Sequence, residues 1–520
     1  MREGTVMELG KVLDGVNIKE VRTYKVNHPR IMTKQQDGED TSLALLKEEI
    51  SGLAYDSRQV KPGFLFFCIP GLKFDGHDFA AQAVAKGATV LVVERFLKLE
   101  VPQILVTSSR DSLSQGACNF HNNPSQKMLM IGITGTNGKT TTTHLVEAVL
   151  RAKGLSVAVI GTIGNRLGER SWLATHTTPE SLDLQALLAK MEHAGAHAVV
   201  MEVSSHALDQ GRVDHVEFDY AIFTNLTQDH LDYHGTIENY REAKSILFKK
   251  LEQGEKKTPK RAIINNDDLH GPFFCQECSV PIITYGLHEG AMIRGTNCLV
   301  TPKGASCDVT YPRGKVTMKL QLTGLFNLSN ALSAFAIAYA EGVEEKQIIE
   351  ALRAVKGVPG RFETVDQGQP FSVIVDYAHT PDGLENVLMT AKKVARKRLI
   401  TVVGCGGDRD RTKRPKMGSV AAQWSDWVVI TSDNPRTEKP EQIIEDILPG
   451  IHGVTETSYE VIVDRKSAIK RALMLAEADD LILIAGKGHE TYQIIGTEVF
   501  PFDDREVATE ILRGLGYEKA

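Results

Sequence analysis

An apolar strand that runs directly into a glycine-rich turn and then into a helix is the most constraining feature of this chain. Residues 128–143 read MLMIGITGTNGKTTTT, with Gly135 and Gly138 in the turn, Lys139 next, and threonines opening the helix. Backbone N–H groups of such a turn and of a helix N-terminus point at phosphates. Lys139 can reach the β- and γ-phosphates, and the Thr140 hydroxyl can ligate Mg²⁺. The segment therefore predicts a site for a nucleoside triphosphate.

The loop departs from the general pattern G-x-x-x-x-G-K-[ST] at its first glycine. Ile133 stands at that position, and Gly132 and Gly135 bracket it. The strand and the helix that the motif requires are both present. A phosphate loop is therefore favoured over an ordinary glycine-rich turn.

Length and composition bound the remaining possibilities. A chain of 520 residues predicts three domains at roughly 150 residues each. The net charge of −6 argues against a nucleic-acid partner, and no apolar run approaches the ~20 residues that span a bilayer. Residues 1–20 contain acids and no apolar segment, so no signal peptide is expected.

The seven cysteines are scattered and predict reduced thiols in a cytoplasmic protein. Cys275 and Cys278 form one CxxC pair, but Cys298 and Cys307 do not repeat its spacing. Unligated thiols are therefore favoured over a zinc site.

From about residue 50 the chain alternates apolar strands and helices. Runs such as SVAVIGT and AVVMEVSS predict a parallel sheet buried on both faces. The polar residues 21–45 predict an insertion or a flexible stretch. Residues 285–325 favour irregular β-structure, 327–340 predict an amphipathic helix, and a Gly/Pro linker at 356–360 precedes a second α/β pattern.

Four strands of this second pattern each end in a polar loop. Their sequences are SVIVDYAHTPD, LITVVGCGGDRD, WVVITSDNPR and LILIAGKGHE. Ligands bind at the carboxyl ends of strands in open parallel sheets. One such loop would be ordinary turn chemistry, but four loaded with Asp, Arg, His and Lys predict a binding surface.

Acidic and histidine side chains after the phosphate loop predict a magnesium site. Glu202 ends a buried strand, where a carboxylate is costly unless it meets a cation such as Mg²⁺. His230 lies in the crowded loop TQDHLDYH, for which a role at the metal is favoured over a surface turn. Lys244, on the following helix, is by itself predicted to be a solvated lysine.

These motifs, taken in order, resemble those of the Mur ligases of peptidoglycan synthesis. They are TGTNGKTTTT, MEVSSHAL, FTNLTQDHLDYHG, EAKSILF, LTGLFNLSNALSA, GRFE, DYAHTPD, GCGGDRDRTKRP, SDNPR and GKGHE. The likeness runs from about residue 51 to the C-terminus. The phosphate loop alone is shared with folylpolyglutamate synthetases, whereas YDSR, MEVSSHAL, GGDRD and DNPR together are more specific.

The resemblance implies an α/β protein of three domains. They are a UDP-substrate-binding α/β domain at 1–110, with 1–49 partly flexible, a central phosphate-loop ATPase domain with a parallel sheet at 111–356, and a Rossmann-like amino-acid-binding domain at 357–520. It also implies a cytoplasmic monomer that uses ATP and Mg²⁺ and acts on small molecules. No nucleic acid and no membrane insertion are expected.

The reaction that the resemblance implies is amide formation. ATP phosphorylates the D-glutamyl γ-carboxylate of UDP-N-acetylmuramoyl-L-alanyl-D-glutamate. The amino group of an incoming amino acid, expected to be meso-2,6-diaminopimelate, then attacks the acyl phosphate to give an amide, ADP and phosphate. A lysine-adding ligase, another superfamily ligase such as a folylpolyglutamate synthetase, and a non-catalytic nucleotide-binding module are the alternatives.

Residue by residue, the resemblance assigns contacts to each substrate. The expected contacts of the UDP-muramoyl-peptide are Tyr55, Ser57, Leu72, Lys73, Phe74, His176, Thr177, Thr178, Ser204, Gln210 and Arg212. The expected ATP contacts are Thr136, Asn137, Gly138, Lys139, Thr140, Thr141, Thr142, Asn327, Asn330, Arg361 and Asp376. Those of the amino acid are Arg409, Asp433, Asn434, Pro435, Arg436, Gly486 and Glu490.

The resemblance also assigns the metal and the catalysis. The expected Mg²⁺ ligands are Thr140, Glu202, His230 and Lys244, the last as a carbamate. The expected catalytic residues are Lys139, Lys244, His230 and Glu202. Many members of the family have asparagine at the position of His176.

The DNPR tetrad favours diaminopimelate as the amino acid. Pro435 stiffens the turn and fixes the direction of Arg436. Diaminopimelate carries a carboxylate and an ammonium at each end, which suits Arg436 and Arg409 together with the Glu490 carboxylate. Lysine lacks the far carboxylate and would leave Arg436 unpaired. The alternative is that Arg436 forms a salt bridge on its own loop.

Overall fold

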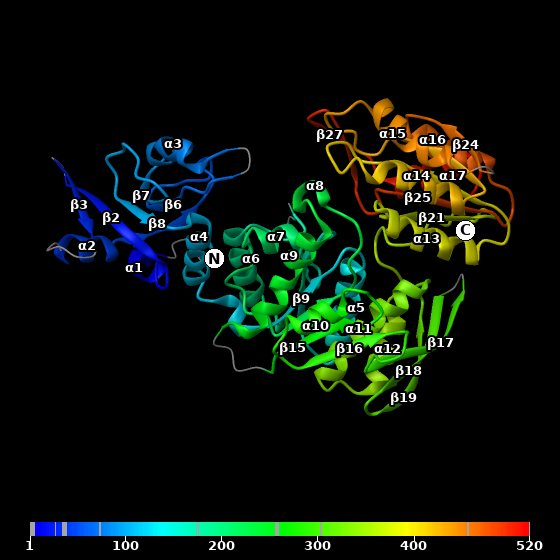
Figure 1. Ribbon diagram of the computed structural model, residues 1–520, viewed down its shortest axis with the longest axis horizontal. Coiled ribbons are helices and arrows are strands. Elements are labelled where there is room, and N and C mark those ends of the chain that lie inside the picture. Colours follow the sequence, from blue (N-terminus) through cyan, green and yellow to red (C-terminus); the bar gives the residue numbers. More distant parts are fainter. Residues whose placement is uncertain are drawn as a thin grey trace. The chain divides into compact units, whose positions relative to one another are not determined.

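The structure is a computed structural model that describes residues 6–25, 28–33, 39–71, 74–172, 174, 176–254, 259–301, 304–454 and 457–518. The chain divides into two compact units (Figure 1). Unit 1 comprises Met1–Gly132, Ser156–Asp219 and Lys249–Lys260. Unit 2 comprises Ile133–Leu155, Tyr220–Phe248 and Arg261–Ala520.

Unit 1 begins with a six-stranded sheet in the order β3-β2-β8-β7-β6-β5. Its strands are β2 (Ile18–Lys25), β3 (His28–Thr33), β5 (Gly52–Ala54), β6 (Phe64–Phe67), β7 (Ala88–Val93) and β8 (Gln103–Val106). Strands β5 to β8 are parallel, and β2 pairs antiparallel with β8 and with β3. Both faces are covered, because α1 (Leu9–Val12) and α4 (Ser109–Phe120) pack on one and α3 (Ala80–Ala85) on the other.

Of the two readings of residues 21–45, an insertion or a flexible stretch, the flexible one is wrong where the structure describes these residues. Strand β2 is hydrogen-bonded into the sheet on both sides, and α2 spans Glu39–Leu46. The strand escapes detection because its sequence, IKEVRTYK, is mostly polar. One of its polar side chains, Thr23, is nonetheless buried.

The second part of unit 1 contains β10 (Val157–Gly161), β11 (Gly164–Leu167), β12 (Arg170–Trp172) and β13 (Ala198–Glu202). Strands β10 and β13 are parallel, as their apolar runs predict, and every residue of both is buried. Helices α6 (Ser181–His193) and α7 (Ser205–Asp209) belong to the same part.

Strand β9 (Leu129–Thr134) passes from unit 1 into unit 2, where α5 (Lys139–Ala152) follows the glycine-rich turn. Unit 2 continues with the parallel strands β14 (Tyr220–Phe223), β15 (Arg261–Asn265), β16 (Ile282–Gly286) and β17 (Ile293–Thr301). Strands β18 (Gly304–Tyr311) and β19 (Gly314–Leu320) then add on antiparallel. The predicted change to more irregular β-structure over 285–325 is confirmed.

Helix α11 (Leu325–Ala340) confirms the predicted helix but not its amphipathic character. Residues on all sides of it are buried, because it packs against α5 and also against β16 and β17. A helix enclosed by other elements needs no polar face.

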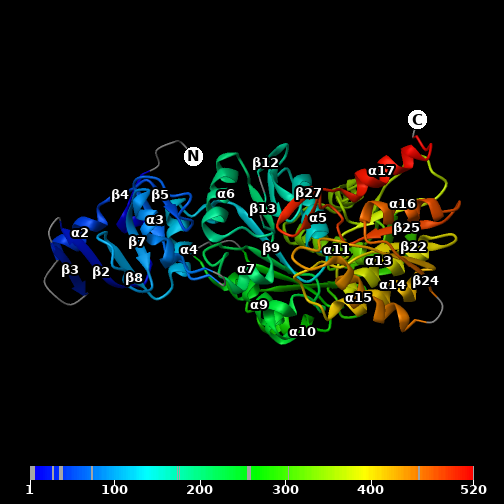
Figure 2. The same ribbon diagram turned by 90° about the horizontal axis from the view of Figure 1, so that it is seen from above.

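The C-terminal part of unit 2 is a six-stranded sheet in the order β20-β21-β25-β22-β23-β24. Its strands are β20 (Glu363–Thr364), β21 (Ser372–Asp376), β22 (Leu399–Val403), β23 (Trp427–Ile430), β24 (Ser458–Val461) and β25 (Leu481–Ala485). All but β20 are parallel. Helices α13 (Pro381–Val394), α14 (Lys413–Trp424) and α15 (Pro440–His452) pack on one face, and α16 (Arg465–Leu475) and α17 (Asp504–Gly514) on the other (Figure 2).

This arrangement confirms the predicted second α/β pattern and places its four polar loops after β21, β22, β23 and β25. A hairpin of β26 (Tyr492–Ile495) and β27 (Glu498–Pro501) follows the last of them. Within the described ranges, no helix is both long enough and apolar enough to cross a membrane.

Candidate active site

The phosphate loop has the backbone conformation that its glycines permit. Gly135 and Gly138 have φ angles of +149° and +85°, values that residues with a side chain rarely adopt. A Cβ on Gly138 would lie 2.5 Å from the Asn330 side-chain oxygen. Helix α5 begins at Lys139, so the N–H groups of its first turn have no acceptor within the helix. The loop is therefore a narrow cradle suited to phosphate oxygens.

The loop after β14 holds the phosphate loop from one side. The side-chain oxygen of Asn225 accepts from Asn137 N at 2.8 Å, and its backbone oxygen accepts from Thr136 N at 2.8 Å. The Thr224 hydroxyl donates to Asn137 O at 2.7 Å. These bonds fix the turn in advance of any ligand.

Lys139 and Thr140 lie at the glycine-rich turn, where the nucleotide site is predicted. Lys139 Nζ folds back over the turn and donates to the carbonyls of Gly135 and Thr136, both at 2.8 Å. The Thr140 hydroxyl accepts from Arg361 Nη2 at 3.0 Å. Among the residues that the structure describes, the buried Arg361 Nε has no hydrogen-bond partner, which leaves a donor for a further group.

Lys244 is buried, with 1% of its surface exposed, so the prediction of a solvated lysine is wrong. Its Nζ donates to Gly135 O at 2.9 Å and lies 4.3 Å from the centre of the Tyr240 ring. Burial, then the charge of Lys139, holds the pKa of Lys244 well below its ordinary value, with Asp229 opposing. An uncharged amine beside a phosphate loop is the form that can react with CO₂ to give a carbamate.

Asp229 and His230 form an acidic and histidine cluster after β14. Asp229 Oδ2 lies 3.3 Å from His230 Nε2 and 3.9 Å from His379 Nε2, and Oδ1 lies 3.8 Å from Lys413 Nζ. Burial raises the pKa of Asp229, but His230, His379 and Lys413 outweigh it and lower the pKa to about 2. The cluster therefore holds a carboxylate in its charged form close to the phosphate loop.

The remaining nucleotide candidates surround the same loop. Asn330 Oδ1 accepts from the Thr142 hydroxyl at 3.4 Å and Asn330 Nδ2 donates to Asn327 Oδ1 at 3.3 Å. Asp376 accepts from Phe362 N at 2.6 Å and Ala378 N at 2.7 Å, although burial raises its pKa. Thr141, like Thr140 and Thr142, is buried in the first turns of α5.

The loops after β22, β23 and β25 bring the amino-acid candidates together. Asn434 Nδ2 donates to Glu490 Oε2 at 2.8 Å, and the Asp433 carboxylate faces Gly486, since a Cβ there would lie 2.7 Å from Asp433 Oδ2. Burial, then the charge of Asp433, raises the pKa of Glu490. Pro435 is buried in the same turn.

Arg436 is held by carbonyl groups instead of acids. Its Nη1 donates to Gly407 O at 2.8 Å, and its φ of +52° is fixed by backbone bonds with Ile494 and Gly496. Burial, then the charge of Arg409, lowers the pKa of Arg436. Across the described part of the chain Arg436 forms no ion pair. The alternative prediction, a salt bridge between Arg436 and an acid of its own loop, is therefore not observed among these residues.

Unit 1 gathers a second set of candidates around the end of β13. The Thr178 hydroxyl donates to Glu202 O at 2.9 Å and accepts from Ser204 N at 3.1 Å. Arg212 donates to Thr178 O at 3.1 Å and to Gln210 Oε1 at 2.7 Å.

Glu202 is buried and accepts from Thr162 through both carboxylate oxygens, at 2.9 and 3.0 Å. The Thr162 hydroxyl also lies 3.1 Å from that of Thr177. His176 is an exposed residue, but the surrounding protein still removes some water from its ring. This desolvation, then the charge of Arg212, lowers the pKa of His176. Glu202 belongs to unit 1, whereas Thr140, His230 and Lys244 belong to unit 2.

The nucleotide-sugar candidates of unit 1 are more dispersed. The Tyr55 hydroxyl donates to Asp183 at 2.7 Å and the Ser57 hydroxyl to Gln82 at 2.8 Å. Phe74 is 73% exposed and meets Phe79 edge-on. Leu72 and Lys73 lie outside the described residues.

The structure adds residues that the sequence analysis missed. Asp382, at the start of α13, accepts from Asn137 Nδ2 at 3.1 Å and from the Thr227 hydroxyl at 3.3 Å. His379 and Lys413 join the Asp229 cluster, and Lys487 lies beside Glu490. The motifs that contain these residues, DYAHTPD, GGDRDRTK and GKGHE, are recognisable in the sequence. The contacts of these residues could not be predicted from it, because most of their partners lie elsewhere in the chain.

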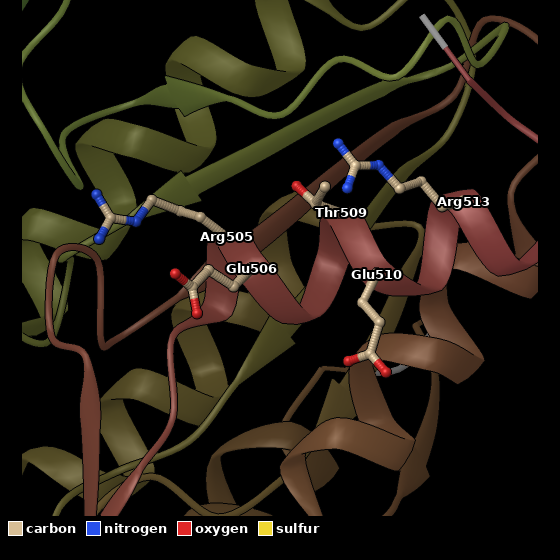
Figure 3. Close-up of a pocket in the computed structure, with 5 residues that line it drawn as sticks. All are labelled: Arg505, Glu506, Thr509, Glu510 and Arg513. Carbon is tan, nitrogen blue, oxygen red and sulfur yellow. The ribbon is translucent and has the colours of Figure 1, made fainter.

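In the part of the chain that the structure describes, metal clusters, disulfide bonds and the hollow along α17 add no candidate residue to the site. Over the described residues, no group of three or more His, Cys, Asp and Glu side chains is placed to hold a metal ion, and no cysteine is in a disulfide bond. A hollow of about 370 Å³ lies along α17 (Figure 3). It is lined by Arg505, Glu506, Thr509, Glu510 and Arg513, none of them a candidate residue.

Three protein-family models match the chain. They are the Mur ligase family catalytic domain over residues 49–121, the Mur ligase middle domain over 133–338 and the Mur ligase glutamate ligase domain over 360–488.

Curated relatives match nearly the whole chain. The UDP-N-acetylmuramoyl-L-alanyl-D-glutamate–2,6-diaminopimelate ligase of Geobacillus thermodenitrificans is 50% identical over 461 residues, which cover 88% of this chain and 94% of the relative. The ligase of the same name from Syntrophomonas wolfei is 48% identical over 471 residues, covering 90% and 96%.

Solved structures agree with the fold. A UDP-N-acetylmuramoyl-L-alanyl-D-glutamate–2,6-diaminopimelate ligase superposes with a TM-score of 0.64 at 34% identity, covering 90% of this chain and 95% of that one. The MurF ligase of Thermotoga maritima in complex with ADP gives 0.58 at 20% identity, covering 89% and 96%. At that identity the second match concerns the fold alone.

Proposed function

This chain belongs to the Mur ligase family, and we propose that it adds meso-2,6-diaminopimelate to the D-glutamyl γ-carboxylate of UDP-N-acetylmuramoyl-L-alanyl-D-glutamate. It is an ATP-dependent, ADP-forming amide ligase of peptidoglycan precursor synthesis. Mur ligases use ATP and Mg²⁺. The relatives of 50% and 48% identity that bear this activity in their names support the substrate pair.

The observation that carries the choice of amino acid is the environment of Arg436. Its guanidinium donates to backbone carbonyls, and the Glu490 carboxylate lies in the same set of loops. A guanidinium without an acidic partner attracts a carboxylate, and Glu490 attracts an ammonium. The far end of diaminopimelate carries both groups, whereas the far end of lysine carries only the ammonium.

A carboxylate is a poor acyl donor at neutral pH, so the reaction needs a leaving group. Transfer of the γ-phosphoryl group of ATP to the γ-carboxylate oxygen releases ADP and supplies one. The amine nitrogen then forms a bond to the acyl carbon, the carbon–oxygen bond to phosphate breaks, and the amine loses a proton. In this proposal Lys139 and Arg361 offset negative charge on the transferring phosphoryl group.

The residues present fit a magnesium nucleotide, because the Gly138 cradle admits no side chain and Arg361 Nε is an unpaired buried donor. We propose Thr140, Glu202, His230 and carbamylated Lys244 as the groups that hold the metal. When bound, Mg²⁺ neutralises charge on the triphosphate. The candidates around Tyr55 and Arg212 would bind the UDP-muramoyl-peptide.

We further propose a three-domain division at residues 110 and 356, and a monomer acting in the cytoplasm. Each small-molecule substrate has its own candidate residues on this single chain. The three family models, which begin at 49, 133 and 360, support the division.

An amino-acid panel tests the proposed function. ADP formation is measured with the purified protein, ATP, Mg²⁺, UDP-N-acetylmuramoyl-L-alanyl-D-glutamate and one amino acid at a time. Diaminopimelate should exceed lysine by about tenfold to a few hundredfold in kcat/KM, because lysine leaves a partly buried guanidinium unpaired at a cost of roughly 1–3 kcal/mol. Lysine equal to or better than diaminopimelate refutes the assignment.

A further inference from the structure

A fully buried lysine lies in the amino-acid pocket and has no role in the proposed function. Lys487, in the loop after β25, has an exposed fraction of 0%. Lysine is among the residues least often buried completely, and a buried ammonium needs partners. Its Nζ donates to Glu490 Oε2 at 3.0 Å and to Asn434 Oδ1 at 3.2 Å. Both partners are candidate contacts of the amino acid.

The hydrogen bonds around Lys487 determine which way the Asn434 amide faces. Asn434 Oδ1 receives two donors, Lys487 Nζ and the backbone N–H of Ile494 at 3.0 Å. An ammonium and a backbone N–H can only donate, so the atom that faces them must be the oxygen. The amide nitrogen must then face Glu490 Oε2, which it contacts at 2.8 Å.

The same bonds leave a defined pair of groups unused. Glu490 Oε2 accepts from both Lys487 and Asn434, while Glu490 Oε1 has no partner among the residues that the structure describes. Asn434 Nδ2 carries two hydrogens and donates one of them to Glu490. Within the described part of the chain, one carboxylate acceptor on Glu490 and one amide donor on Asn434 therefore remain for a ligand.

We propose that Lys487 is a positioning residue for the incoming amino acid. Its ammonium favours the charged form of Glu490 and holds Asn434 in the orientation that presents one acceptor and one donor. An ammonium group of the amino acid would bind Glu490 Oε1, and a carboxylate oxygen would accept from Asn434. This inference rests on the proposed function, because it concerns the same pocket.

The chemistry predicts a distinctive loss when the cation is removed. Without Lys487, Glu490 would lose the cation that its carboxylate contacts, while burial and then the charge of Asp433 raise its pKa. Arg436 and Arg465 are other cations that act on Glu490. A protonated Glu490 does not attract an ammonium. The Asn434 amide would also be free to turn, because one of the two donors that face its oxygen would be gone.

The experiment compares Lys487→Met with Lys466→Met in the full-length protein. Lys466 lies on α16, is half exposed and pairs with Glu510, so it is a lysine control whose ion pair involves no pocket candidate. Lys487→Met should raise the KM for diaminopimelate about tenfold to a hundredfold, the loss expected for hydrogen bonds to charged groups. The KM for ATP and the KM for the UDP-substrate should each stay within about twofold.

The pH profile separates positioning from a merely structural role. In Lys487→Met the KM for diaminopimelate should fall as the pH rises, because a Glu490 whose pKa is raised further by loss of the cation then loses its proton. The unmodified protein and Lys466→Met should show a flatter profile. An unchanged KM, or a parallel rise of all three KM values with no pH dependence, overturns the proposal.

A second pair of variants keeps the test decisive if Lys487→Met does not fold. Glu490→Gln and the double variant Lys487→Met/Glu490→Gln both remove the carboxylate that Lys487 contacts. The KM for diaminopimelate in the double variant should exceed that in Glu490→Gln by less than about tenfold, since only the orientation of Asn434 is then left to lose. A larger difference overturns the proposal. Failure of the unmodified protein to use diaminopimelate would instead refute the proposed function, and the variants would then be compared with the amino acid that it does use.

Discussion

Arg361 Nη2 donates a 3.0 Å hydrogen bond to the hydroxyl of Thr140, a residue 221 positions earlier in the chain. The same guanidinium lies 4.6 Å from the centre of the Tyr377 ring. Arg361 thus joins the first turn of α5 to the loop after β21, and its buried Nε is left for a further acceptor. The contact ties the phosphate loop to the C-terminal part of unit 2.

Arg361→Lys should raise the KM for ATP by about tenfold, because an ammonium cannot stack on Tyr377 and donate from a planar fork at once. Initial rates of ADP formation at varied ATP concentration measure the effect. Arg396→Lys is the matched control, since Arg396 is exposed and pairs with Asp479. An Arg361 variant with an unaltered KM for ATP would contradict the proposed nucleotide contact.

Lys139→Ala should lose ATP turnover by a hundredfold or more, on the order of the contribution of a charged group to a phosphoryl transition state. Calorimetry should show that binding of the UDP-substrate survives, because its candidates lie in unit 1. Lys153→Ala, just beyond the end of the same helix, is the control. Loss of UDP-substrate binding in Lys139→Ala would indicate unfolding or a shared site.

Lys244→Ala should nearly abolish ligation, and added short carboxylic acids should partly restore it. Burial, then the charge of Lys139, lowers the pKa of Lys244 and so favours the uncharged amine, which can form a bond to CO₂ with loss of a proton. A small carboxylate can fill the space that the side chain vacates and replace the charge of the carbamate. The rescue is measured as ADP formation, with Lys249→Ala at the exposed end of α9 (Ile237–Lys249) as the control. Full turnover in Lys244→Ala without added acid would disprove the role.

Arg436→Ala should raise the KM for diaminopimelate about tenfold to a hundredfold and leave that for ATP within about twofold. The reason is that the carboxylate of the amino acid would lose its guanidinium partner. Rates at varied concentrations of each substrate distinguish the two effects. Equal increases in both KM values would show that Arg436 supports the fold of the loop instead.

Lowering the pH should destabilise unit 1 through His121. Burial, then the charge of Lys190, lowers the pKa of His121 to about 4, whereas an unfolded histidine has a pKa of about 6.5. Between these values the unfolded chain binds more protons, so the free energy of unfolding falls as the pH decreases, by up to roughly 3 kcal/mol. His121→Gln removes this term. As the pH is lowered from about 6.5 to about 4, the Tm of the unmodified protein should therefore fall more than the Tm of His121→Gln. A difference between the two Tm values that does not change with pH would exclude the effect.

Features that depend on neighbouring residues could be predicted from the sequence. The strand, glycine turn and helix around Lys139 are encoded within one short segment, and so are the polar loops that follow apolar strands. The motifs and their order along the chain were sufficient to recognise the family, since each motif is a short, continuous segment. Helix α11 shows where this reasoning ends: its helical period was readable, but its complete burial depends on α5 and on strands outside the segment.

By itself the sequence determined the phosphate loop, the α/β class and the identity of the polar residues at the strand ends, because backbone geometry and turn chemistry act over a few residues. Only the tertiary structure decided which side chains are buried and what they face. Lys244 meets Gly135, 109 residues away, and Asp382 meets Asn137, 245 residues away. Lys487 lies three positions before Glu490 in its motif, but its contact with Asn434 joins it to a residue 53 positions earlier. Desolvation and charge depend on such distant neighbours, so no local pattern contains them.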